Sequence, residues 1–225
     1  MPSRWARAFS SCGSYSHVEG VLHRRGAETA VDLLIPAIED DIYADLYFGA
    51  IRPKPLKAWD RDGRVLLCSS LSKTLAPGLG LGWIAAGRYH SKVEDRKWST
   101  NPHFAQKVAA RFLQEGYDRQ LRRIRSCYQE RMRAVREAVR TYFPRGTRVT
   151  EPAGGFVLWV ELPPSVDALK LRLSALKEKI STAPGPMFSV RHEFRNHLRI
   201  YAGLPWTAAF EKAIQALGRL AQSQI

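Results

Sequence analysis

Cysteine is scarce in this chain of 225 residues: there are three, Cys12, Cys68 and Cys127, and none are spaced as Cys-x-x-Cys. An odd, widely spaced set of thiols indicates neither a disulfide framework nor a cysteine zinc site. It favours a reducing compartment, so we expect the protein in the cytoplasm. Long apolar runs are also missing, both at the length of a membrane span and as the apolar core of a signal peptide.

Acidic residues are few relative to basic ones. The chain has 35 Lys and Arg against 21 Asp and Glu, which gives a formal net charge of +14 at pH 7. Such an excess attracts anions in general, including nucleic acid, phosphate-bearing cofactors and acidic metabolites. Apolar residues are plentiful by contrast, at 45% of the chain, which predicts a folded protein with a hydrophobic core rather than a disordered one.

The most informative stretch runs from Ser69 to Trp83. The apolar segment Arg64–Cys68 precedes it and is typical of a buried parallel strand. Lys73 then follows among serines and ahead of a Pro-Gly turn. A lysine at the end of a buried strand, beside hydroxyl groups that suit an anion, is well placed to act as a nucleophile or an imine-forming amine. The alternative is an exposed lysine in a polar loop, which the rest of the stretch argues against.

The pattern S-x-S-K-x-x-x-P-G-x-x-x-G-W resembles the cofactor-lysine motif of fold-type I aminotransferases. It is formed here by Ser70, Ser72, Lys73, Pro77, Gly78, Gly82 and Trp83. In its residue sequence, the stretch is most similar to the aminotransferase-like domain of the MocR subgroup of GntR-type transcriptional regulators. The resemblance implies an α/β fold: part of the large domain of an aspartate aminotransferase-like PLP-transferase, with a mainly parallel sheet, and then a small α+β C-terminal domain.

The resemblance covers roughly Ala30 to Leu220 and also divides the chain. We expect an irregular lead-in over residues 1–26, a partial large, PLP-binding domain over 27–104, and a linking helix with the small domain over 105–225. The linking helix is predicted independently, because apolar residues recur at helical spacing from about Phe104 to Tyr142, with a break at Gly116.

Eight arginines lie between Arg119 and Arg140 on the polar side of this helix. They could bind nucleic-acid phosphates, but their interleaving with Glu130 and Glu137 is that of a solvated helix face, which we favour. Further along, the pattern predicts two strands with a bend over Arg148–Leu162, a helix over Val166–Lys179, a strand and turn over Ile180–Pro186, a strand over Phe194–Gly203 and a closing helix over Thr207–Gln222.

The segment Ala37–Phe48 places acids and an aromatic residue at the end of a short strand. Ligand-binding groups usually lie at that end of the strands in an α/β sheet. The resemblance implies that Asp40 faces the pyridine nitrogen of pyridoxal 5'-phosphate (PLP) and that Tyr43 faces its phenolic oxygen. The adjacent Asp41 is the rival for the role of Asp40, and a solvated acidic turn is the alternative for both.

The resemblance implies further that Lys73 holds PLP covalently and later acts as general base at the amino acid α-carbon. It makes Ser70 and Ser72 phosphate-binding residues. It also assigns Arg199, on the predicted strand Phe194–Gly203, to the α-carboxylate of the substrate, since a guanidinium fork matches a carboxylate. A structural role is the alternative for this arginine.

One position departs from the family pattern P-G-x-R-x-G-W: Gly80 stands where the family has an arginine that pairs with the cofactor phosphate. Loss of this charge-assisted hydrogen bond predicts weaker PLP binding. The family's upstream phosphate-binding and ring-stacking residues do not precede Asp40 here. A winged-helix module is absent as well, so we expect DNA binding only through such a missing N-terminal module.

Together these observations predict a PLP-dependent aminotransferase-like protein that acts on an amino acid and a 2-oxo acid. We expect a homodimer, because fold-type I enzymes build each active site from two subunits. Two alternatives stay open: the effector-sensing half of a MocR/GntR-type transcriptional regulator, and an inactive fragment.

Overall fold

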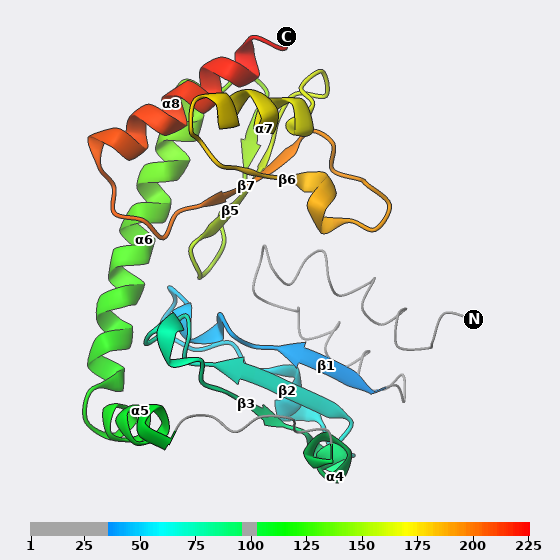
Figure 1. Ribbon diagram of the computed structural model, residues 1–225, viewed down its shortest axis with the longest axis vertical. Coiled ribbons are helices and arrows are strands. Elements are labelled where there is room, and N and C mark those ends of the chain that lie inside the picture. Colours follow the sequence, from blue (N-terminus) through cyan, green and yellow to red (C-terminus); the bar gives the residue numbers. More distant parts are fainter. Residues whose placement is uncertain (1–35, 96–102) are drawn as a thin grey trace. The chain divides into compact units, whose positions relative to one another are not determined.

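The computed structural model describes residues 36–95 and 103–225 (Figure 1). The predicted lead-in and the helix expected from Ala27 lie outside the described residues. Within the described part, two compact units divide between Arg125 and Ser126, inside one long helix. The sequence-based domain limits at residues 104 and 105 therefore stay a prediction, and each unit is described below by itself.

The first unit contains a three-stranded sheet in the order β1-β2-β3 (Figure 1). Its strands are β1 (Ala37–Asp40), β2 (Val65–Ser70) and β3 (Gly82–Ala85). β1 and β2 are parallel, whereas β2 and β3 are antiparallel, so the described sheet is mixed. β2 confirms the strand predicted from Arg64 to Cys68 and continues it by two residues, to the edge of the lysine turn.

Short helical segments connect and flank these strands. They are η1 (Ala44–Leu46), η2 (Leu56–Trp59), η3 (Pro77–Leu79), η4 (Gly87–Tyr89), α4 (His90–Glu94) and α5 (His103–Glu115). Leu56 and Val65 form one small core with the half-buried Ala37 and Trp59. A second core joins the lysine turn to α5, and it contains Leu81, Ala105 and Ala109 with Leu71, Leu75 and Leu79 around them.

Helix α6 (Tyr117–Tyr142) follows α5 after the break predicted at Gly116. Its apolar stripe faces inward as the spacing predicts, with Leu121, Met132 and Val139 buried. The arginine face is only partly the solvated surface that we expected. Arg125 is half-buried, and its Nε donates a 2.6 Å hydrogen bond to the backbone carbonyl of Asp45 in the first unit.

The second unit has a four-stranded antiparallel sheet in the order β4-β5-β7-β6. Its elements are β4 (Arg148–Val149), β5 (Val157–Glu161), α7 (Ala168–Lys177), β6 (Ala183–Pro184), η5 (Gly185–Phe188), β7 (His197–Tyr201) and α8 (Ala208–Gln222). Alternate residues of the central strands, including Leu158, Val160 and Leu198, are completely buried. Their neighbours, among them Trp159 and Arg199, occupy the opposite, half-exposed face.

Helices α7 and α8 of this unit begin at side-chain caps. Asp167 accepts hydrogen bonds from the backbone N–H groups of Leu169 and Lys170, and Thr207 accepts one from Phe210. Such caps satisfy amide groups that the first helical turn leaves unpaired, which explains where α7 and α8 start. Both helices confirm the sequence prediction. No helix within residues 36–95 and 103–225 is long and apolar enough to cross a membrane.

Candidate functional site

The lysine turn follows β2 directly and is closed by backbone hydrogen bonds. Leu71 donates to the carbonyl of Leu81 at 3.0 Å, and Leu75 donates back to Leu71 at 2.8 Å. Lys73 lies at the centre of this closed turn and is half-buried. The turn therefore presents the amine from a defined backbone at the end of a strand, as the sequence predicts.

Two further candidate residues lie at the same edge of the sheet. Asp40 ends β1, level with Cys68 of the parallel strand β2. Tyr43 follows one turn later, and its ring centroid lies 5.8 Å from Nζ of Lys73. Because parallel strands end at the same edge, the acid, the phenol and the amine are brought together there.

The two adjacent acids differ sharply in their surroundings. The Asp41 side chain is only 10% exposed, and its Oδ2 accepts a hydrogen bond from Nη2 of Arg52 at 2.6 Å. Burial raises the pKa of the Asp41 carboxyl, although the pairing with Arg52 opposes that rise. Asp40 is exposed, and its Oδ1 accepts a long 3.4 Å hydrogen bond from the backbone N–H of Ile42. The Asp40 carboxylate is thus the one that solvent or a ligand can reach.

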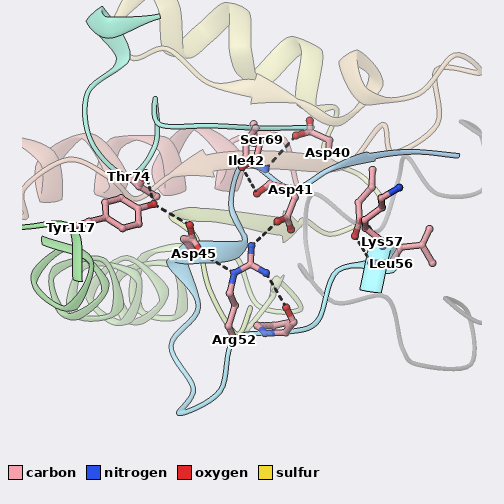
Figure 2. A network of polar contacts seen from close by, with 12 residues as sticks. Asp40, Asp41, Ile42, Asp45, Arg52, Leu56, Lys57, Ser69, Thr74 and Tyr117 are labelled. Atoms are coloured by element: carbon pink, nitrogen blue, oxygen red, sulfur yellow. Dashed lines mark hydrogen bonds and ion pairs between the residues drawn. The ribbon is translucent and has the colours of Figure 1, made fainter. Parts of the chain in front are cut away.

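Arg52 connects two acids on either side of Tyr43 (Figure 2). Besides its bond to Asp41, its Nε donates to Oδ1 of Asp45 at 2.7 Å. Burial acts to lower the pKa of Arg52, but its hydrogen bonds to the two carboxylates raise it. The short chain segment between the two acids, which carries Tyr43, is consequently held at both ends.

Tyr117, the first residue of α6, joins Asp45 to the lysine turn (Figure 2). Oδ2 of Asp45 accepts a 3.0 Å hydrogen bond from the hydroxyl of Tyr117. The same hydroxyl shares a 3.1 Å hydrogen bond with Thr74, which follows Lys73 in the chain and is 3% exposed. Burial and the Asp45 carboxylate raise the pKa of Tyr117 to about 12.

The predicted phosphate residues Ser70 and Ser72 lie at the end of β2 and within the turn, both half-buried. Gly80 ends η3 with φ 59° and ψ 27°, a left-handed conformation that glycine adopts without strain. A Cβ added at Gly80 would meet nothing within 4 Å. The chain therefore offers hydroxyl groups and open space beside the lysine turn, but no side chain at position 80.

The sequence of the chain matches a known family over most of its length. A family model described as aminotransferase class I and II matches residues 28–217. The chain belongs to the aminotransferase class I and II family. The relatives that this family member matches include both regulators and enzymes.

An uncharacterized HTH-type transcriptional regulator of Escherichia coli, YjiR, is 43% identical over 188 residues, which are 82% of this chain and 40% of that protein. Aromatic-amino-acid aminotransferase 1 of Thermococcus litoralis is 33% identical over 193 residues, 83% of this chain and 45% of the enzyme. The chain thus spans less than half the length of these curated relatives.

Among solved structures, the α-aminoadipate aminotransferase LysN of Thermus thermophilus, complexed with N-(5'-phosphopyridoxyl)-L-leucine, superposes with a TM-score of 0.82 at 26% identity. The match covers 92% of this chain and 56% of that one. The fold is therefore that of the aspartate aminotransferase-like PLP enzymes, of which this family member contains a part of the large domain and the small domain.

Arg199, the remaining predicted site residue, lies on β7 in the second unit of this aminotransferase-family chain. It stands opposite Trp159 in β5, and its guanidinium carbon lies 4.6 Å from the ring centroid of Phe188. A guanidinium stacked on an aromatic face keeps its edge N–H groups available to a planar acceptor. The other predicted residues, by contrast, all belong to the first unit.

Sequence reasoning missed four residues of the site: Asp45, Arg52, Thr74 and Tyr117. Asp45 lies in the acidic segment Ala37–Phe48, and Thr74 is a spacer of the lysine motif. Tyr117 follows the helix break at Gly116, whereas Arg52 lies outside the segments to which we gave a role. The signal that could have suggested Arg52 is the nearby excess of acids, since three acids within six residues require a cation when partly buried. Nothing local to Thr74 or Tyr117 indicates that they meet.

Replacing Arg52 by Gln tests how strongly this arginine holds the segment between Asp41 and Asp45. The Asp41 carboxyl would lose the partner that opposes the burial-driven rise of its pKa. We expect a loss of about 2 kcal/mol of unfolding free energy near pH 7. The loss should shrink as the pH is lowered toward 4, because protonation of the Asp41 carboxyl, whose pKa is raised, removes the charge that Arg52 compensates.

Urea denaturation followed by tryptophan fluorescence at both pH values measures these losses. Arg111→Gln is the matched control, because Arg111 is 78% exposed and pairs with Glu115 on the surface of the same unit. We expect the control to lose less than about 0.5 kcal/mol at either pH. An Arg52→Gln loss that is equally large near pH 4 would contradict the role given to ionised Asp41.

Proposed function

We propose that this chain binds PLP at Lys73 and supports amino-group transfer between an amino acid and a 2-oxo acid. One observation carries the proposal: the Lys73 amine, the Tyr43 ring and the exposed Asp40 carboxylate share one sheet edge in a member of the aminotransferase class I and II family. An amine, a phenol, an acid and hydroxyl groups together suit a planar anionic cofactor with a reactive carbonyl.

Each residue at this edge has a distinct role in the proposal. When bound, PLP supplies an electron sink for the α-carbon of the amino acid. Lys73 would hold the cofactor covalently; once the amino group of the substrate has displaced it, the free Lys73 amine would take up the proton from the α-carbon as general base. Asp40 keeps the ring nitrogen protonated, and Tyr43 donates a hydrogen bond to the phenolic oxygen. Ser70 and Ser72 donate hydrogen bonds to the phosphate.

Arg199, in the second unit, has the proposed role of binding the α-carboxylate of the amino acid. Its support is the guanidinium stacked on Phe188 on the half-exposed face of the second sheet. A bidentate pair fixes both the position and the plane of a carboxylate, which a lysine at the same place would not do. The proposed substrate class is therefore any amino acid with a free α-carboxylate.

A second candidate function is the effector-sensing part of a MocR/GntR-type regulator. The 43% identity to the HTH-type regulator YjiR favours it, since that value exceeds the 33% identity to the Thermococcus enzyme. DNA binding would then require a winged-helix module joined to this part. Formation of a 2-oxo acid from an amino acid by the PLP-loaded chain would favour the enzyme, whereas stable binding without turnover would favour the sensor.

The amine of Lys73 should be the site of covalent capture. Sodium borohydride converts lysine-bound PLP into a stable label that peptide mass spectrometry can locate. We expect the label on Lys73 and its loss in Lys73→Ala, with Lys92→Ala as a control because Lys92 is exposed in the same unit. Label found mainly on Lys57 or Lys92 would contradict the assignment of Lys73 as the PLP-binding lysine.

Gly80 should limit the affinity for PLP, because no side chain there pairs with the phosphate. Gly80→Arg restores a guanidinium, and Gly80→Ala carries the same left-handed backbone strain without it. Because a charge-assisted hydrogen bond contributes about 1.5–3 kcal/mol, Gly80→Arg should bind PLP about ten- to a hundredfold more tightly than Gly80→Ala. Absorbance titrations compare the two variants, and equal affinities would show that position 80 does not face the phosphate.

We also propose that the chain associates as a homodimer or larger oligomer in the cytoplasm. Family enzymes share active sites between subunits, and Trp83 and Ile84 of β3 are each 50% exposed. Sedimentation velocity at micromolar concentration should therefore show a mass above that of one chain. A single compact species of 25.4 kDa would count against the proposal.

A further inference from the structure

The backbone on the C-terminal side of Lys73 is tied to α6 by a side chain that the proposed reaction does not use. Thr74 follows Lys73 immediately and is 3% exposed, so its hydroxyl needs a protein partner. That partner is Tyr117, at 3.1 Å, the first residue of α6. Tyr117 and Thr74 are 43 positions apart in sequence, so the contact is a specific tertiary one.

The direction of the two hydrogen bonds at Tyr117 follows from its single proton. Asp45 can only accept when ionised, so the Tyr117 hydroxyl donates to its Oδ2 at 3.0 Å and Thr74 donates to Tyr117. With a pKa of about 12, Tyr117 keeps this proton throughout the physiological range. The Tyr117 hydroxyl therefore stays a hydrogen-bond donor over that range.

Asp45 links Tyr117 to the residues beside Asp40. Its Oδ1 is bound by Arg52, which also binds Asp41 next to Asp40 (Figure 2). Its backbone carbonyl accepts a 2.6 Å hydrogen bond from Nε of Arg125. The residues flanking Lys73 and Asp40 are thus connected through Asp45, and these hydrogen bonds use neither the Lys73 amine nor the Asp40 carboxylate.

We propose that Tyr117 is a positioning residue that fixes the lysine turn through Thr74 and relates it to the acid edge through Asp45. The inference rests on the proposed function for its purpose, since a positioned amine matters only if Lys73 reacts. It goes beyond that function because it assigns a role to three side chains that would not touch the cofactor. A group held this way loses less freedom when it reacts.

The alternative is that these hydrogen bonds only contribute to general stability. The two roles predict different sets of backbone hydrogen bonds that weaken when the Tyr117 hydroxyl is removed. A positioning role confines the effect of losing the Tyr117 hydroxyl to the turn, where Leu75 and Ala76 both donate their N–H groups to the carbonyl of Leu71. A general role spreads the effect to the β1–β2 ladder, including the 2.8 Å bond from the N–H of Asp41 to Cys68.

The test is amide hydrogen exchange of the full chain without added PLP, comparing wild type with Tyr117→Phe. We expect the amides of Leu75 and Ala76 to exchange about fivefold faster in the variant, as for loss of one hydrogen bond, with the ladder amides unchanged. Tyr142→Phe is the matched control, since it removes a hydroxyl that donates to Glu211 at 2.9 Å in the other unit. Unchanged exchange in the turn, or equal acceleration of turn and ladder, would overturn the proposal.

A second pair of variants keeps the test decisive if Tyr117→Phe does not fold. Thr74→Val removes the hydroxyl at similar volume, and Thr74→Ser retains it. We expect fast exchange at Leu75 and Ala76 in Thr74→Val and near-wild-type exchange in Thr74→Ser. Equal behaviour of the two would show that the hydroxyl does not hold the turn.

Borohydride labelling then connects the turn to the chemistry. If Lys73 of the wild type captures PLP, the share of label on Lys73 should fall several-fold in Tyr117→Phe but not in Tyr142→Phe. An unchanged share would contradict positioning of the amine. If the wild type captures no PLP at Lys73, the proposed function fails, while the exchange experiment still decides whether Tyr117 orders the turn.

Discussion

The parallel pairing of β1 with β2 is the constraint on which the candidate site depends. It aligns Asp40 with Cys68, so that both strands reach the same edge before the chain turns. The pairing also sets how the two turns meet, because the segment after β1 carries Tyr43 and the turn after β2 carries Lys73. A slip of one residue would point each side chain to the opposite face of the sheet. The backbone hydrogen bonds of this strand pair thus determine which residues lie at the edge.

The sequence predicts this edge well because its signals are local. Strand ends, the serine-lysine turn and the acid pair can be read within a few positions of one another, and the family resemblance adds their roles. Asp45, Arg52, Thr74 and Tyr117 could not be predicted, because their hydrogen bonds join segments that only the tertiary fold brings together. Arg125 shows the same limit: its spacing is that of a solvated helix face, yet its guanidinium lies 3.9 Å from the Tyr47 ring centroid.

Residues of two kinds lie at this edge, and they differ in their burial and in their bonding partners. Asp41, Arg52, Thr74 and Tyr117 are partly or fully buried and satisfy one another, so they stabilise a shape. Asp40 is exposed, and Nζ of Lys73 lies 5.8 Å from the centroid of the Tyr43 ring. This separation explains how a partly buried cluster of acids and bases can sit beside reactive groups without neutralising them. The charges of the supporting residues are paired with one another, and under the proposed function the Lys73 amine would be the group that bonds covalently.

The bonds of Arg52 to Asp41 and Asp45 have a practical consequence for the loop of residues 46–51, which lies between Asp45 and Arg52 in the chain. The loop tip includes Gly49, which has open space around it, and Ile51, which is 84% exposed. The bonds from Arg52 to Asp41 and Asp45 hold both ends of the segment that carries Tyr43. Changes of length or composition at the loop tip therefore need not move Tyr43. The tip is therefore a suitable position for a fluorophore, an affinity tag or an inserted peptide that leaves the edge residues undisturbed.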